Sequence, residues 1–405
     1  MCIRDRGIVP IAGKILGPLV YILWPDSGPD IYELIDEAIT GLARDTAIQD
    51  LENMDRALDK FLSIEMSSPS QIDEYFAAAE LYIYAGLGTF QWNHADVGGE
   101  DYRIEFLPLF AQAENLYLAL LREAVLHGAE WGWDEDTVEF WKETMRAELD
   151  PNDKTKGLGY ALDIYNLGLT QQPTGAGQSD WTTRNQYIRK MTLGVLDFTE
   201  IWKYMDPYEY PNGVPNLKLT RMIYSDPIGV TDHTFKPPPY AYGPLRELTV
   251  WVDKGATYPF IDAIRETGGP TAGPIFTGPI MGDSDLGDSP ARYDFDVAPG
   301  GVDGPIVAVE GYSAMYTQIP EEKLSGLHFS FAGGSLSSGL LGSQVPERIW
   351  LVSTPHVLMT TSTYRFSYPG EAVASIQVMG DYKFQVGRWG ADSVVFGFRF
   401  ADSYY

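Results

Sequence analysis

Apolar residues dominate one stretch of the chain, residues 104–133, with the sequence IEFLPLFAQAENLYLALLREAVLHGAEWGW. A helix over residues 104–127 rises ~1.5 Å per residue and reaches about 36 Å, enough to cross the ~30 Å hydrocarbon core of a bilayer. A helix that is apolar nearly all round is either the buried centre of a helical bundle or a membrane span. The pattern favours the core of a bundle, but a membrane span is also compatible with it. The same helix could also be buried in a bundle first and cross a membrane later.

The few polar residues of this helix gather on one side. Successive residues of an α-helix are rotated by ~100°, which places most of the polar positions within an arc of about 100°. This polar stripe consists of Glu105, Gln112, Asn115, Arg122 and Glu123. Glu114 stands alone on the other side of the helix, so the remaining surface is almost entirely apolar.

Helical periodicity also marks the flanking sequence. Apolar residues recur at helical spacing and predict further helices at residues 30–63, 71–93, 134–149 and 159–169. On the second of these, Asp73, Glu80, Tyr84 and Gln91 share one face. Acidic residues open the helix at 134–149, where the helix dipole favours negative charge. The first part of the chain is therefore predicted to be a helical bundle.

The pattern changes at residue 240. From there to residue 405 the chain is rich in Gly, Pro, Ser, Thr, Tyr and Val, and its apolar residues alternate in short runs such as LTVWV at 248–252, LHFSF at 327–331 and VVFGFRF at 394–400. Such runs, separated by turn formers, are typical of β-strands. The fold class is therefore multidomain α and β, a helical domain followed by an all-β domain.

Several sequence blocks carry a family resemblance. The runs LPLFAQAENLYLALLREAVLHGAEWGW, WTTRNQYIRKMTLGVLDFTEIWKYMDPYEYP and LTRMIYSDPIG occur in the order, and with the residues, typical of three-domain Cry δ-endotoxins, the insecticidal crystal proteins. This resemblance covers about residues 7–229. The segments RELTVWVDKGATYPFIDAIRETGG and GPIVAVEGYSAMYTQIPEEKLSGLHFSF more weakly resemble jacalin-type β-prisms, the fold of the second domain in that family.

The resemblance implies a domain organisation and an activity. Residues 1–230 would be the helical pore-forming bundle, and residues 231–405 a β-prism that binds a receptor or carbohydrate. Since the similarity starts at the family's second helix, we expect the first helix to be missing, MCIRDR to be non-native and the chain to be truncated at its N-terminus. The length leaves no room for the family's third, β-sandwich domain. The central hairpin, residues 71–127, would insert into the target membrane.

Two sets of candidate site residues follow. The candidates for lining the pore are the polar residues of the hairpin: Asp73, Glu80, Gln91, Glu105, Gln112, Asn115, Arg122 and Glu123. The candidates for receptor contact are Gly-rich or aromatic loop positions at one end of the prism: Gly269, Asp283, Asp285, Gly334, Ser335, Tyr368 and Trp389. The alternative for the first set is a solvated helix face, and for the second an ordinary hairpin tip.

Charge and composition narrow the partners. The formal net charge is −27 with an isoelectric point near 4.4, which argues against nucleic acid and against electrostatic capture by anionic lipid. Cys2 is the single cysteine, so no intrachain disulfide or thiolate cluster forms. The five histidines are scattered without a zinc-binding spacing. We therefore expect no cofactor and no metal, with calcium on carboxylates as the open alternative.

Three functional hypotheses remain. The first is a pore-forming toxin that a bacterium stores as a crystal inclusion or secretes, with a host epithelial receptor or glycan, the lipid bilayer and other copies of itself in the pore as partners. The second is a lectin-like protein whose helical domain never inserts. The third is a glycoside hydrolase, which would need two carboxylates in one cleft. Because the acids are dispersed over helical faces, the sequence argues against an enzyme.

Overall fold

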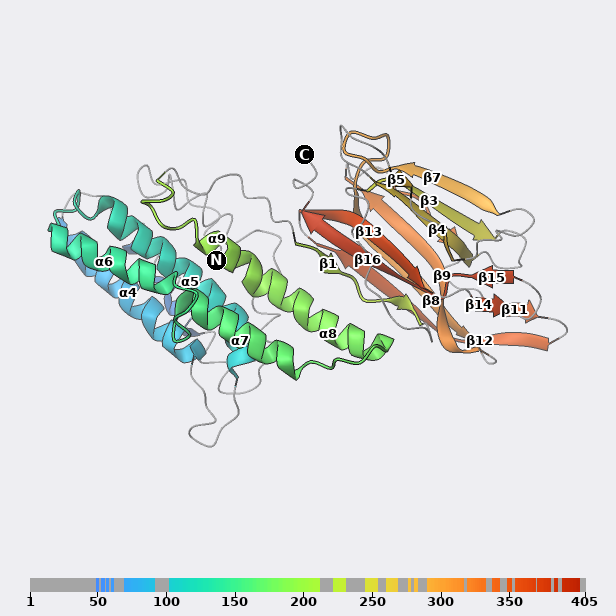
Figure 1. Cartoon of the computed structure of the whole chain (residues 1–405), viewed down its shortest axis with the longest axis horizontal. Coiled ribbons are helices and arrows are strands. Elements are labelled where there is room, and N and C mark those ends of the chain that lie inside the picture. The colour runs from blue at the N-terminus through green and yellow to red at the C-terminus, as the bar shows by residue number, and fades with distance from the viewer. Residues whose placement is uncertain are drawn as a thin grey trace. The chain divides into compact units, whose positions relative to one another are not determined.

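A computed structural model shows helices in the first part of the chain and strands in the second (Figure 1). It describes residues 49–50, 52–54, 56–57, 60–61, 69–91, 102–211, 221–230, 245–253, 260–268, 276–277, 280–282, 290–316, 319–332, 337–342, 348–351, 354–368, 370–379, 382–384 and 388–400. The predictions for residues 1–48, including the start of the helix at 30–63 and the non-native N-terminus, lie outside this part.

The chain divides into two compact units. The first consists of residues 1–171 and 190–217, and the second of residues 172–189 and 218–405. The two units are not continuous in sequence, because the helical segment 172–189 belongs to the same unit as the strands. The domain boundary at residue 230 remains a prediction.

The described helices match the predicted periodicity closely. They are α4 (Pro69–Gln91), α5 (Arg103–His127), α6 (Glu135–Glu148), α7 (Gly157–Gln171), α8 (Gln178–Met191), the π-helix η4 (Thr192–Leu196) and α9 (Asp197–Trp202). The side chain of Asp134 caps α6, since its Oδ1 accepts a hydrogen bond of 2.8 Å from the Thr137 N–H. The π-helix η4 directly joins α8 to α9.

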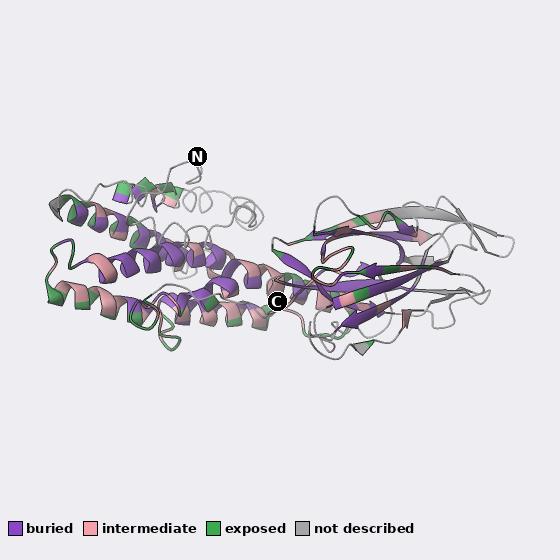
Figure 2. Ribbon diagram, turned by 90° about the horizontal axis from the view of Figure 1, so that it is seen from above, coloured by how far each residue is buried: buried purple, intermediate pink, exposed green. Residues whose placement is uncertain are grey.

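Helix α5 is the centre of the first unit. Its residues 106–111 and 113–125 are buried, and α4, α6, α7, η4 and α9 all pack against it. Figure 2 shows the buried residues running along the helices of this unit. The bundle-core interpretation of the apolar stretch is therefore confirmed for this state. Within the described residues, no helix combines the length and hydrophobicity of a membrane span.

The second unit contains three antiparallel sheets. One consists of β1 (Ile223–Tyr224), β2 (Ile228–Gly229), β13 (Glu371–Met379) and β16 (Ser393–Phe400). The next consists of β8 (Ile306–Tyr316), β9 (Ile319–Phe331), β10 (Leu341–Gly342), β11 (Arg348–Leu351) and β12 (Thr354–Ser367). The third consists of β3 (Leu245–Asp253), β4 (Phe260–Gly268), β5 (Phe276–Thr277), β6 (Met281–Gly282) and β7 (Ala291–Asp296). A separate hairpin joins β14 (Tyr382–Phe384) to β15 (Arg388–Gly390).

One aromatic side chain from each sheet meets in the common core. The ring of Phe329 on β9 lies 6.1 Å from that of Phe295 on β7 and 6.0 Å from that of Phe396 on β16, measured between centroids. All three side chains are buried. Three sheets around one core are the arrangement of a β-prism, so the predicted fold class, a helical bundle followed by an all-β prism, is confirmed.

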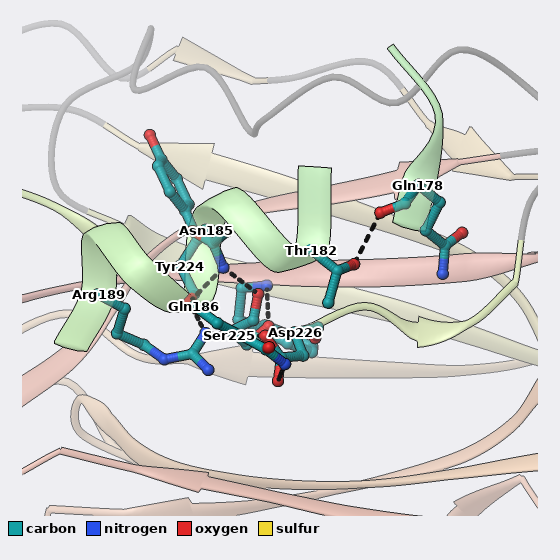
Figure 3. A network of polar contacts seen from close by, with 9 residues as sticks. Gln178, Thr182, Asn185, Gln186, Arg189, Tyr224, Ser225 and Asp226 are labelled. Atoms are coloured by element: carbon teal, nitrogen blue, oxygen red, sulfur yellow. Dashed lines mark hydrogen bonds and ion pairs between the residues drawn. The ribbon is translucent and has the colours of Figure 1, made fainter. Parts of the chain in front are cut away.

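Polar contacts attach α8 to the strands of the second unit (Figure 3). The buried Asn185 donates hydrogen bonds of 3.1 and 3.3 Å to the carbonyl oxygens of Tyr224 and Ser225. Arg189 donates to the Tyr224 carbonyl at 2.6 Å and to Asp226 Oδ1 at 3.0 Å. These bonds satisfy backbone carbonyls beside β1, which explains why this helix groups with the β unit.

We expect Phe329→Ala to lower the free energy of unfolding of the β unit by about 3–5 kcal/mol, because it removes a ring shared by all three sheets and leaves a cavity. Calorimetric unfolding would measure the change. The control is Val302→Ala, at a position that is 83% exposed, where we expect an effect near zero. Equal effects of the two substitutions would contradict the shared core.

Candidate functional site

The polar residues of α5 form the candidate site, and the structure places them inside the helical bundle. Asn115 is fully buried, and Arg122 and Glu123 are each 1% exposed. Glu105 and Gln112 are half-buried. A solvated helix face is therefore excluded for these stripe residues in this state. Burying such groups is costly unless partners compensate, so the contacts of each one matter.

The side of α5 that carries Asn115 and Arg122 is covered by the end of α9 and the segment after it. The indole N–H of Trp202, the last residue of α9, donates a hydrogen bond to Asn115 Oδ1. Arg122 donates through Nη1 to the Met205 carbonyl at 2.6 Å and through Nη2 to the Tyr210 carbonyl at 2.8 Å. We call residues 202–210 the cover segment, because they bond Asn115 Oδ1 and both terminal nitrogens of Arg122. Asn115 Nδ2 and Arg122 Nε have no hydrogen-bond partner among the described residues.

Glu123 is the least compensated member of the stripe. Neither of its carboxylate oxygens has a hydrogen-bond partner among the described residues, and the His127 ring lies 3.8 Å away, from Nε2 to Oε2. Burial raises the pKa of Glu123 to about 7, and His127 and Arg122 oppose that shift. The group therefore exchanges its proton near neutrality.

The three candidates on α4 have different surroundings. Asp73 is exposed and accepts a hydrogen bond from the Trp133 indole N–H. Glu80 is half-buried, and burial raises its pKa. Gln91 donates to the Thr155 carbonyl at 3.3 Å. The exposed surface of α4 also carries large apolar or aromatic side chains, namely Leu81, Tyr82 and Tyr84. The structure therefore does not present a purely acidic face on this helix.

The sequence analysis did not select two further acidic residues of this core. Glu114, the acid of α5 outside the polar stripe, is 0% exposed, and Glu148 at the end of α6 is 4% exposed. Burial raises the pKa of Glu114 well above its usual range, and the neighbouring Glu148 raises it further. The signal available in the sequence was the single acid on an otherwise apolar helix side, but its neighbour on α6 is not visible in any local pattern.

Two of the candidate receptor residues, Tyr368 and Trp389, fall within the described part of the chain. Tyr368 is half-buried, with its ring 4.9 Å from that of Phe398, and burial raises its pKa to about 12. It precedes the end of the β13–β16 ladder at Glu371, whereas Trp389 precedes the opposite end at Ser393. The other candidates lie outside the described residues: Gly269, Asp283, Asp285, Gly334 and Ser335. In the part that is described, no three His, Cys, Asp or Glu side chains lie close enough together to hold a metal ion.

Comparisons with known proteins agree with this architecture. The family model described as delta endotoxin, N-terminal domain, matches residues 87–206. The chain is 28% identical over 266 residues to the pesticidal crystal protein Cry8Ca of Bacillus thuringiensis subsp. japonensis, covering 60% of this chain and 21% of Cry8Ca. It is 33% identical over 245 residues to Cry1Bb of Bacillus thuringiensis, covering 55% of this chain and 19% of Cry1Bb. It thus spans about a fifth of the length of these two relatives.

The fold comparison extends over both units. The structure of the insecticidal delta-endotoxin Cry8Ea1 from Bacillus thuringiensis matches with a TM-score of 0.69 at 16% identity, covering 98% of this chain and 70% of that one. A helical bundle with a central buried helix, followed by a three-sheet β unit, is thus the fold of the delta-endotoxin class. The sequence blocks, the delta-endotoxin domain matched at residues 87–206 and the similarity to the two relatives together support a member of the Cry δ-endotoxin family.

We expect Arg122→Lys to lower the free energy of unfolding of the helical unit by about 2 kcal/mol, because an ammonium group cannot reach both carbonyls as the planar guanidinium does. Urea unfolding followed by circular dichroism at 222 nm would measure this. Arg146→Lys, at an exposed position of α6, is the matched control and should leave the midpoint unchanged. An unchanged midpoint for Arg122→Lys would show that the cover segment is not held by this side chain.

Proposed function

We propose that this chain is a pore-forming toxin of the insecticidal type, in which the hairpin of residues 71–127 inserts into a host membrane. The observation that supports this most is the enclosed α5 helix, which combines a broad apolar surface with buried polar side chains. The hydrogen bonds described for the side chains of Asn115 and Arg122 run to the cover segment, which is a separate stretch of chain. The helix can therefore lose this cover without breaking its own backbone hydrogen bonds.

Insertion exchanges one environment for another. In the bundle, the apolar faces of α4 and α5 pack on neighbouring helices; in a bilayer the same faces would contact lipid, and every backbone group would stay bonded within its helix. Polar residues inside a membrane are tolerated where they face a water-filled cavity. Several copies of the hairpin, with the polar stripe turned toward a common channel, would meet both conditions.

The β unit supplies recognition in this proposal. A host epithelial receptor or glycan binds loops of the prism, since loops held by a rigid scaffold commonly carry recognition. The bundle then opens at the membrane and the chain assembles with further copies of itself. The protein is stored in a bacterial crystal inclusion or secreted, and acts outside the producing cell.

A disulfide between α5 and η4 tests the insertion step. A Cβ atom added at Gly194 would lie 3.3 Å from Cβ of Pro108, near the Cβ separation of roughly 3.5–4.5 Å found in disulfides. We expect oxidised Pro108→Cys/Gly194→Cys, in a Cys2→Ser background, to release no dye from phosphatidylcholine vesicles carrying brush-border membrane components. Reduction should restore the release to that of the Cys2→Ser chain, because α5 then separates from η4.

The single variants Pro108→Cys and Gly194→Cys are the matched controls and should release dye under both redox conditions. Release by the oxidised double variant would contradict insertion of α5. Absence of release by every form, with retained glycan binding, would favour the lectin-like alternative.

A further inference from the structure

Two acidic side chains lie buried in the helical core, Glu114 on α5 and Glu148 at the end of α6, and these two helices pack against each other. Glu114 is completely buried, and neither of its carboxylate oxygens has a hydrogen-bond partner among the described residues. Glu148 is the last residue of α6. The C-terminal end of a helix carries partial negative charge, so this position disfavours an ionised carboxylate. Burial and the helix end thus both oppose charge on the pair.

The surrounding groups offer little compensation. Helix α4 contributes Glu80 and Tyr84, and α5 itself contributes Tyr117. The turn before α7 contributes Asp153 and Lys156. Lys156 is the cation that acts on both glutamates, but its Nζ lies 3.8 Å from Asp153 Oδ2 and the side chain is 39% exposed. A partly solvated lysine that also faces an aspartate neutralises two buried carboxylates only weakly.

Proton affinity follows from this arrangement. Burial is the main reason that the pKa of Glu148 rises to about 7, with Asp153 adding to the shift and Lys156 opposing it. Burial likewise raises the pKa of Glu114, and the negative charge of an ionised Glu148 adds to it. Two buried carboxylates that interact electrostatically do not ionise independently, so they retain a proton between them at a pH where exposed glutamates have lost theirs.

We propose that Glu114 and Glu148 form a proton-dependent lock on the helical bundle, which holds α5 against α6 while the pair keeps a proton and loosens when both carboxylates are ionised. Full ionisation places two repelling charges in a water-poor core, where the only relief is separation of the helices or entry of water. The lock itself does not depend on the proposed pore-forming function. Its role, which is to release α5 for insertion, rests on that function.

The direction of the pH effect is fixed by the raised pKa values. Below the pKa of an unfolded glutamate, both states are protonated and the pair has no effect on stability. As the pH rises toward and through about 7, the unfolded chain has already lost these protons while the folded chain must still release them from its core. Stability is therefore lost with rising pH, and the loss is complete once both carboxylates of the folded bundle are ionised.

Neutral, isosteric substitutions test the lock. We expect Glu114→Gln and Glu148→Gln each to resist urea better than the unchanged chain at about pH 9, and much less so at about pH 5.5. For Glu148→Gln, the ratio of the two unfolding constants should change on the order of thirtyfold between these pH values. Circular dichroism at 222 nm would follow the helical unit. Glu143→Gln, which removes an exposed carboxylate of the same α6 helix, is the matched control and should show no such change.

The double variant Glu114→Gln/Glu148→Gln tests whether the two residues act as a pair. Its gain at about pH 9 should be smaller than the sum of the single gains, because each single change already removes the same repulsion. The proposal would be overturned if a single variant gained the same resistance to urea at both pH values. It would also be overturned if the gain of the double variant equalled the sum of the two single gains. If one variant fails to fold, the remaining single variant still decides through its pH dependence.

The experiment separates the lock from the pore. Urea unfolding uses no membrane, so a pH-dependent gain without dye release from vesicles would retain the lock and reject pore formation. Dye release without a pH-dependent gain in resistance to urea would support pore formation and contradict the proton-dependent lock.

Discussion

The enclosure of α5 is the constraint on which the rest of the helical unit depends. A helix with this many apolar residues has to be surrounded by other helices, and α4, α6, α7, η4 and α9 all contact it. The same enclosure removes Asn115, Arg122 and Glu114 from water. Each buried polar group then requires a partner or loses its charge, so the chemistry of the core follows from the demand to bury an apolar helix.

The buried polar groups on different faces of α5 are compensated in different ways. On one side, Arg122 and Asn115 are bonded to the cover segment by directed hydrogen bonds. About a quarter turn away around the helix, the buried Glu114 interacts electrostatically with a second acid, Glu148, and the arrangement is stable in proportion to the protons it retains. Removing a partner from a buried, bonded charge costs several kcal/mol, on the order of 3–5. Ionising an acid pair destabilises the same core without breaking any hydrogen bond.

The sequence predicted what is periodic and local. Apolar spacing located α5 and identified it as a bundle core, the acidic residues of its first turn located α6, and strand alternation located the prism. It did not predict that Glu148 acts electrostatically on Glu114, because periodicity defines the face of a helix and not the neighbour on that face. The grouping of α8 with the β unit was also missed, since it depends on Asn185 and Arg189 reaching backbone carbonyls near β1 that no pattern marks.

The two sides of α5 respond to different events. Burial lowers the pKa of Arg122, but a guanidinium keeps its charge throughout the accessible pH range, so rising pH leaves its bonds to Met205 and Tyr210 intact. The pair of Glu114 and Glu148 changes charge within that range. A rise in pH can therefore loosen α5 from α6 while the cover segment still holds the face that carries Asn115 and Arg122. Complete release of α5 would need a second event that displaces residues 202–210, such as binding at a surface.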